Sequence, residues 1–132
     1  MLHLLSDCFS RLTTSAKLSK KNVVVLNSNV VKKSLFILYK LGFIRYFKIL
    51  SFKYIKIYLK YYQGNNSVLR GVSSLSKPSL QFFIKFKNLQ RYAFNNKFSI
   101  NGFIICSTSR GLLTDIECVL TKTGGKALFF VC

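Results

Sequence analysis

A strictly alternating segment, KYIKIYLKYY at residues 53–62, constrains the fold of this chain more than any other feature. Successive side chains of a β-strand point to opposite faces, so the alternation predicts two different faces. One face carries Ile55, Ile57, Leu59 and Tyr61, and the other carries Tyr54, Lys56, Tyr58 and Lys60. The segment therefore predicts a strand with one face in a core and one basic, aromatic face.

The first residues allow two interpretations. Leu5, Phe9 and Leu12 fall at helical spacing on one side, with Asp7 and Arg11 on the other, which predicts an amphipathic helix. Residues 1–21 are also basic and rich in hydroxyl groups, with a single acid, which is typical of a mitochondrial presequence. The residues of this segment alone leave both interpretations open.

A short strand and a second helix are predicted next. The apolar run Val23–Leu26 is consistent with a buried strand. Asn27–Asn29 offers N-cap chemistry for a helix that runs to Leu41 and ends at Gly42. The residues expected to face inward are Val31, Leu35, Leu38 and Leu41. The chain therefore begins with an α-β-α pattern.

The most turn-rich stretch, Gln63–Ser67, is the predicted domain boundary. It divides the chain into two lobes, residues 1–64 and 65–132. Each lobe is small and would bury only a modest core.

A strand is predicted after Pro78, which forces Lys77 toward an extended conformation. Alternation over residues 81–87 places one set of side chains inward, namely Phe82, Ile84 and Phe86. Phe83 then lies among polar and basic neighbours, including Lys85. It is either a platform on which a base stacks or an aromatic packed on the opposite strand.

A hydroxyl triplet, Ser107-Thr108-Ser109, follows an apolar strand that closes at Ile104 and Ile105. With Gly111 it predicts a turn at a strand-to-helix junction. Serine and threonine are ordinary turn residues that bond their own backbone. The alternative is that they offer donors and acceptors to the 2′-hydroxyls of RNA.

Two of the three carboxylates of the chain have a predicted structural role. Thr114 and Glu117 have the spacing of a capping box, and Asp115 favours the positive end of the helix dipole. The Gly124-Gly125 pair is expected to end this helix in a left-handed turn. A closing strand, Ala127–Val131, should follow.

Charge identifies the class of partner. Lys and Arg number 21 against 3 Asp and Glu, a formal charge of +18, and a polyanionic partner removes the resulting repulsion. Nucleic acid is the first candidate. The alternative is an anionic membrane surface that binds the Tyr54, Lys56, Tyr58 and Lys60 face, although charges interrupt every apolar run too soon for a membrane span.

Enzymatic, metal and cofactor functions are poorly supported. The chain has three carboxylates and one histidine, His3, so general acid–base chemistry lacks candidates. The cysteines are Cys8, Cys106, Cys118 and Cys132, and none forms a C-x-x-C pair. We expect no metal, cofactor or small-molecule substrate, and thiols that are buried or incidental.

The segment CSTSRGLLTDIECVLTKTGGKALFFV, residues 106–131, resembles the carboxyl-terminal signature of the ribosomal small-subunit protein eight family. The matching residues are Ser107, Thr108, Ser109, Gly111, Thr114, Asp115, Glu117, Gly124 and Gly125. SLSKPSLQFF and LYKLGFIRYF are similar to earlier segments of that family, and the likeness begins near Ser6-Asp7. It therefore covers nearly the whole chain and favours a first helix over a presequence.

The resemblance implies an α+β fold with two small lobes, an amino-terminal α-β-α-β-β lobe and a mostly β carboxyl-terminal lobe with one short helix. It implies a structural constituent of the small ribosomal subunit that binds the central domain of the small-subunit rRNA and contacts neighbouring small-subunit proteins. It assigns RNA contact to Ser107, Thr108 and Ser109 and, at a family tyrosine position, to Phe83. Among the lysines, Lys77, Lys85 and Lys126 are expected to contact RNA.

Departures from the family pattern limit what is carried over. Thr13-Thr14-Ser15 replaces an R-N-A segment, Cys118 replaces an alanine, and Lys126 replaces a glutamate, which suggests a new phosphate contact. A preference for Lys over Arg, with many Phe, Tyr, Asn and Ile residues, suggests an A+T-rich gene. We therefore expect a mitochondrial ribosome, with a plastid or bacterial ribosome as the alternative.

Overall fold

The computed structural model describes residues 2–63, 66–75, 81, 83–85, 87–88 and 102–131, with the side chains of Leu2 and His3 excepted. Predictions on Lys77, Pro78, Phe82, Phe86 and Cys132 lie outside these residues. The chain divides into two compact units, Met1–Val72 and Ser73–Cys132. Both combine helix and strand, so the predicted α+β class is confirmed.

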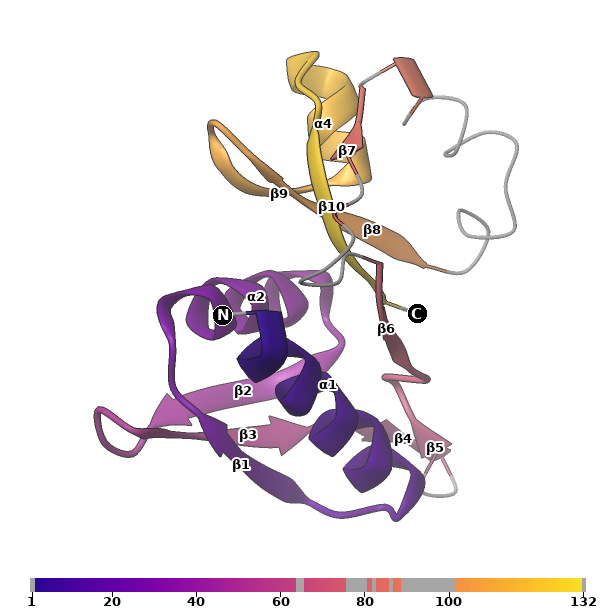
Figure 1. Ribbon diagram of the computed structural model, residues 1–132. Helices are drawn as coiled ribbons and strands as arrows, with labels where there is room; N and C mark the ends of the chain where they lie inside the picture. Colours follow the sequence, from indigo (N-terminus) through magenta and orange to yellow (C-terminus); the bar gives the residue numbers. More distant parts are fainter. Residues whose placement is uncertain are drawn as a thin grey trace. The chain divides into compact units, whose positions relative to one another are not determined.

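Unit 1 contains two helices and a three-stranded sheet (Figure 1). Its helices are α1 (Leu2–Lys17) and α2 (Asn29–Leu41), and its main strands are β1 (Asn22–Leu26), β2 (Ile44–Ile49) and β3 (Tyr54–Leu59). The strand order is β1-β3-β2, and β3 is antiparallel to both neighbours. β3 therefore lies between the two strands that α2 connects.

The core of unit 1 lies between the helices and one face of this sheet. The predicted inner face of α1 is confirmed, since Leu5, Phe9 and Leu12 are buried. α2 contributes buried Val31, Leu35 and Leu38, and β3 contributes Ile55, Ile57 and Leu59. Removing so much apolar surface from water is the main stabilising term of the unit.

The ends of α2 follow from local chemistry. Ser28 is the N-cap, and its hydroxyl accepts a hydrogen bond of 3.2 Å from the Val31 amide. Gly42 ends the helix at φ +84°, a left-handed conformation that glycine adopts without the steric penalty of a side chain. The predicted helix and its stop are confirmed.

Two predictions for unit 1 need correction. β1 is not a fully buried strand, because Val24 and Leu26 point to the exposed face and only Val25 is fully enclosed. The β3 pattern does not continue unbroken, since Tyr61–Tyr62 forms a separate strand, β4, after Lys60. β4 pairs with β5 (Asn66–Ser67) around the predicted boundary at Gln63–Ser67, and that boundary stays a prediction.

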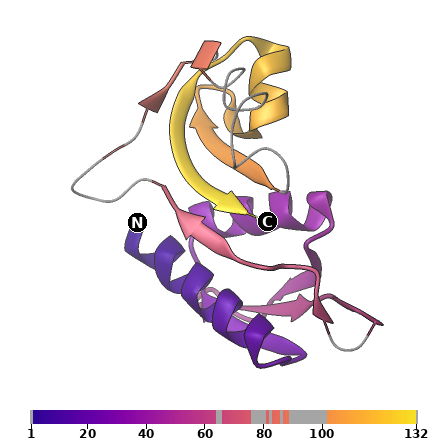
Figure 2. The same ribbon diagram turned by 90° about the vertical axis from the view of Figure 1, so that its right-hand side faces the viewer.

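In the part of unit 2 that the structure describes, a short helix packs on a five-stranded sheet (Figure 2). The elements are β6 (Val72–Ser74), which begins at the last residue of unit 1, β7 (Phe83–Ile84), β8 (Phe103–Thr108), β9 (Gly111–Thr114), α4 (Asp115–Thr121) and β10 (Gly125–Val131). β10 pairs with β8 along one edge and with β6 and β7 along the other. A register shift between Ala127 and Phe129 accompanies the curvature of β10 visible in Figure 2.

The core of unit 2 lies between α4 and the inner face of the sheet. Its buried members are Ile84, Ile104, Cys106, Cys118 and Ala127. The three described cysteines, Cys8, Cys106 and Cys118, are buried and form no disulfide. Burial raises the pKa of the Cys8 thiol to about 12, so it stays protonated at neutral pH.

None of the helices in the described part of the chain is long and apolar enough to span a membrane.

Candidate nucleic-acid interface

The hydroxyl triplet lies at the tip of the β8–β9 hairpin. Ser107 and Thr108 end β8, Ser109 and Arg110 form the turn, and Gly111 begins β9. The predicted strand-to-helix junction is therefore wrong, because a strand intervenes before α4. Leu112 and Leu113 pair with Ser107 and Cys106, so the two apolar residues extend the sheet.

The turn is held by Thr108. Its hydroxyl donates to the Gly111 carbonyl oxygen at 2.9 Å and accepts from the Arg110 amide at 3.2 Å. Gly111 has φ +105°, a conformation that strains any residue with a side chain. Thr108 thus uses its one donor inside the turn and keeps a single lone pair free.

Ser107 and Ser109 differ from Thr108 in this respect. Among the described residues, neither serine hydroxyl has a hydrogen-bond partner. Ser109 is exposed, and Ser107 is half-buried at the strand end. These two hydroxyls are available to an external ligand.

Three predicted site residues form a row across three strands. Lys126 on β10 lies opposite Ser107 on β8 and opposite Phe83 on β7. Residues directly opposite one another in an antiparallel ladder project from the same face. Leu112, opposite Ser107 on β9, extends the row. We call these four residues the outer row.

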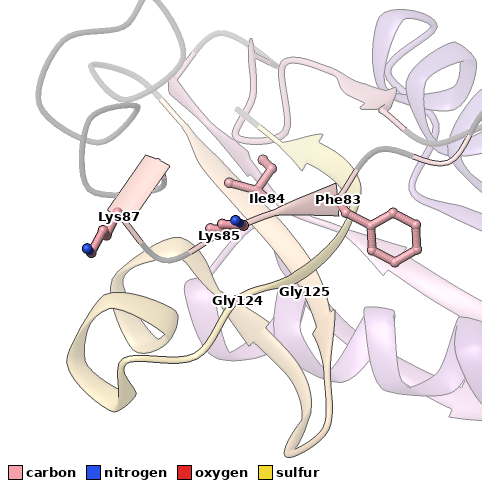
Figure 3. A pocket seen from close by; sticks show the side chains of 6 residues that line it. All are labelled: Phe83, Ile84, Lys85, Lys87, Gly124 and Gly125. Atoms are coloured by element: carbon pink, nitrogen blue, oxygen red, sulfur yellow. The ribbon is translucent and has the colours of Figure 1, made fainter.

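Burial supports this assignment of faces. Phe83 is 68% exposed, whereas its chain neighbour Ile84 is buried in the core. The two possibilities for Phe83 are thereby separated, because the ring projects into solvent and does not pack on the opposite strand. Figure 3 shows the Phe83 ring directed away from the Ile84 side chain.

A pocket of about 620 Å³ lies beside Phe83 (Figure 3). Its lining includes Lys85 and Lys87, together with the backbone of Gly124 and Gly125. A pocket lined by two lysines and bordered by an aromatic residue suits a phosphate and a base. Lys85 was expected to contact RNA, whereas Lys87 was not among the expected RNA contacts.

Gly125 allows β10 to approach the hydroxyl turn. A Cβ atom placed there would overlap the backbone carbonyl of Ser107 and press on the Thr108 methyl group. The Gly124-Gly125 pair does not end α4, which corrects the prediction. Lys122 does so at φ +54°, while the Thr123 amide donates to the Cys118 carbonyl oxygen at 3.0 Å.

The predicted capping box is present at the start of α4. The Glu117 amide donates to Thr114 Oγ1 at 3.3 Å, and the Thr114 amide donates to Glu117 Oε2 at 3.1 Å. Asp115 accepts a hydrogen bond from the Ile116 amide at 2.9 Å. Burial raises the pKa of the Asp115 carboxyl, and this hydrogen bond offsets part of the rise.

Several members of this surface could not be identified from the amino-acid sequence. Strand register places Lys126 opposite both Ser107 and Phe83, and it places Leu112 in the same row. Alternation within one segment does not reveal this register. Lys77 lies outside the described residues, so the structure does not place it relative to the outer row.

Comparison with known proteins gives one consistent result. A family model described as ribosomal protein S8 matches residues 3–132. The chain is 37% identical over 127 residues to small ribosomal subunit protein uS8m of Acanthamoeba castellanii, covering 96% of this chain and 97% of that protein. It is 31% identical to uS8c of Euglena gracilis, covering 98% and 97%, and 32% identical to uS8 of Lysinibacillus sphaericus (strain C3-41), covering 96% and 95%.

Proposed function

The chain belongs to the ribosomal protein S8 family, and we propose that it binds the central domain of the small-subunit rRNA and supports assembly of that domain. Members of this family are structural constituents of the small ribosomal subunit, not enzymes.

The outer row is the observation that carries the proposal. It combines a cation, a hydroxyl and an exposed aromatic ring on one face of one sheet, from Lys126, Ser107 and Phe83. RNA offers a matching set of groups, since it presents phosphates, 2′-hydroxyls and, where its helix is irregular, accessible bases. A duplex without irregularities would satisfy only part of this surface.

Each group has a distinct role in the proposed contact. Lysines supply most of the affinity by neutralising phosphates, with Lys126 opposite Phe83 and with Lys85 and Lys77 as further expected contacts. Ser107 and Ser109 bond sugar and base edges, and Phe83 stacks on a base. Thr108 shapes the turn and offers its remaining lone pair to the RNA.

The acids beside this surface act through the fold. Thr114, Asp115 and Glu117 start α4 directly after β9, and β9 holds one side of the turn. Gly111 and Gly125 permit the turn geometry and the close approach of β10. They support the contact without touching RNA.

We further propose that the chain works in a mitochondrial ribosome. The relative from Acanthamoeba castellanii carries the mitochondrial name uS8m, and the composition suggests an A+T-rich gene. A plastid or bacterial ribosome is the alternative location, because the chain is also similar to uS8c of Euglena gracilis and to uS8 of Lysinibacillus sphaericus. Neighbouring small-subunit proteins are the expected protein partners.

Crosslinking of the intact chain to small-subunit rRNA tests the proposal. Photo-crosslinked peptides should contain Ser107, Ser109 or Phe83, and the crosslinked nucleotides should fall in the central domain. Crosslinks spread over the lysines of the chain, without enrichment in these peptides, would contradict a defined contact at the outer row.

A further inference from the structure

A second face with basic and aromatic character lies on the sheet of unit 1. α1 and α2 cover one face of this sheet (Figure 1). The side chains that point away from the helices are exposed or half-buried. Strand register aligns them in cross-strand rows. The rows are Asn22–Tyr58–Tyr46 and Val24–Lys56–Lys48, and we call these six residues the open sheet face.

Two tyrosines form the centre of this face. The rings of Tyr46 and Tyr58 stack with centroids 4.2 Å apart and an interplanar angle of 20°. Lys56 Nζ lies 5.3 Å from the centroid of the Tyr58 ring, within reach of a cation–π interaction. Tyr46 remains 45% exposed, so the pair is open to a ligand.

A bulge places a cation beside the pair. Ile44 opposes Leu59 and Tyr46 opposes Tyr58, which leaves Arg45 as an extra residue between two register positions. A bulge changes the face of the sheet to which the following side chains point. Without the extra residue, Tyr46 would share the inward face with Ile44.

A pocket of about 620 Å³ adjoins the tyrosine pair. Besides Tyr46 and Tyr58, its lining includes three cations, Lys21, Arg45 and Lys60. The three carboxylates of the whole chain, Asp7, Asp115 and Glu117, do not line it. The pocket therefore complements an anion that lies within a few ångströms of a planar ring.

We propose that the open sheet face binds an unpaired RNA segment, with a base stacked on the Tyr46–Tyr58 pair and a phosphate held by Lys21, Arg45 and Lys60. A nucleotide brings an anion and a planar ring together at the required separation, and only unpaired bases are free to stack on protein rings. This contact goes beyond the function proposed above, which concerns the outer row of unit 2. The protein then binds two distinct RNA features.

The test measures binding of a labelled oligouridine of about 12 nucleotides, a length typical of single-strand sites, by fluorescence anisotropy with the intact chain. Tyr46→Leu with Tyr58→Leu removes the rings and keeps apolar bulk, and we expect a loss of about tenfold in affinity. Tyr46→Phe with Tyr58→Phe keeps the rings and should bind within about twofold of the native chain. Affinity for a blunt RNA duplex of the same length should change little in either variant.

Further variants separate this site from the outer row. Ser107→Ala with Ser109→Ala should leave oligouridine affinity unchanged, while the tyrosine variants should keep affinity for a matched central-domain rRNA helix. Arg45→Gln should reduce the slope of log affinity against log salt by about one on oligouridine. If the leucine pair fails to fold, Tyr46→Leu alone provides the test, since that ring is already half exposed.

Three results would overturn the proposal: unchanged oligouridine binding by the folded leucine variant, equal loss in the phenylalanine and leucine pairs, or equal loss on oligouridine and duplex. Flotation with phosphatidylserine vesicles tests a lipid surface as the occupant. Vesicle binding that depends on the tyrosines, with no effect of the same variants on oligouridine, would also reject an RNA site.

Discussion

Lys126 lies directly opposite Ser107 across the β10–β8 ladder, so an ammonium group and an unpartnered hydroxyl project from the same face of the sheet. The family pattern places a glutamate at the position of Lys126. A carboxylate there would repel a phosphate near the serine, whereas the lysine attracts one. The exchange therefore favours a phosphate contact next to the hydroxyl turn.

Removing the two free hydroxyls should weaken specific binding. Ser107→Ala with Ser109→Ala leaves polar groups of the RNA unpaired, and we expect a loss of about 1–3 kcal/mol on a matched central-domain helix. Binding to generic RNA should barely change. Ser10→Ala, at an exposed position of α1, is the matched control in both titrations. Equal losses on the two RNAs would support a role of the serines in the turn alone.

Removing the charge of Lys126 should act differently from removing the hydroxyls. Lys126→Gln deletes one phosphate contact, so affinity should fall on every RNA and the slope of log affinity against log salt should decrease by about one. Titrations at several salt concentrations measure this slope. Lys33→Gln on α2 is the control, because that exposed lysine lies outside both proposed faces. An unchanged slope for Lys126→Gln would exclude the phosphate contact.

Local chemistry made much of the fold predictable. The spacing of Leu5, Phe9 and Leu12 identified the inner face of α1, and the Thr114–Glu117 spacing identified the start of α4. Both signals depend on residues that lie close together in the sequence. Alternation alone left two interpretations of Phe83, and only its exposed fraction of 68% selects the exposed ring.

The arrangement of the two candidate surfaces was not predictable in this way. The outer row depends on how β7, β8 and β10 pair, and these strands are far apart in sequence. The tyrosine pair depends on the bulge at Arg45, which reverses the apparent face of Tyr46. Lys122 ends α4 despite the cost of about 1–2 kcal/mol for a left-handed residue with a side chain, so the glycine pair misled the prediction.

Gly125 should tolerate no side chain. Gly125→Ala forces a methyl group against the Ser107 carbonyl, and we expect a loss of about 1–3 kcal/mol in the free energy of unfolding, as for overpacking. Urea denaturation measures this change. Gly71→Ala is the control, since nothing lies within 4 Å of the added atom, and its effect should stay within about 1 kcal/mol. Similar values for the two variants would show that the sheet gives way at Gly125.

Glu117 should matter for stability more than for RNA binding. Glu117→Ala removes the acceptor for the Thr114 amide, and the free energy of unfolding should fall by about 0.5–2 kcal/mol. Glu117→Gln retains an oxygen that accepts this hydrogen bond and should recover most of the loss. Thermal and urea denaturation measure stability, and anisotropy measures RNA affinity. A large, selective RNA defect in a stable Glu117→Ala protein would contradict the capping role.

Asp115 should make stability depend on pH with a definite sign. Burial raises the pKa of its carboxyl in the folded state above the ordinary value of 3.8, so the folded state holds this proton more tightly than the unfolded state. The stabilisation that the protonated carboxyl adds to the folded state is fully present below pH 3.8 and is lost as pH rises through the raised pKa.

Asp115→Asn keeps an acceptor for the Ile116 amide but does not titrate. Urea denaturation of both proteins from acid to neutral pH should therefore show the native chain losing stability relative to Asp115→Asn. A difference that stays constant over this range, or one that changes in the opposite direction, would mean that burial does not control this carboxyl.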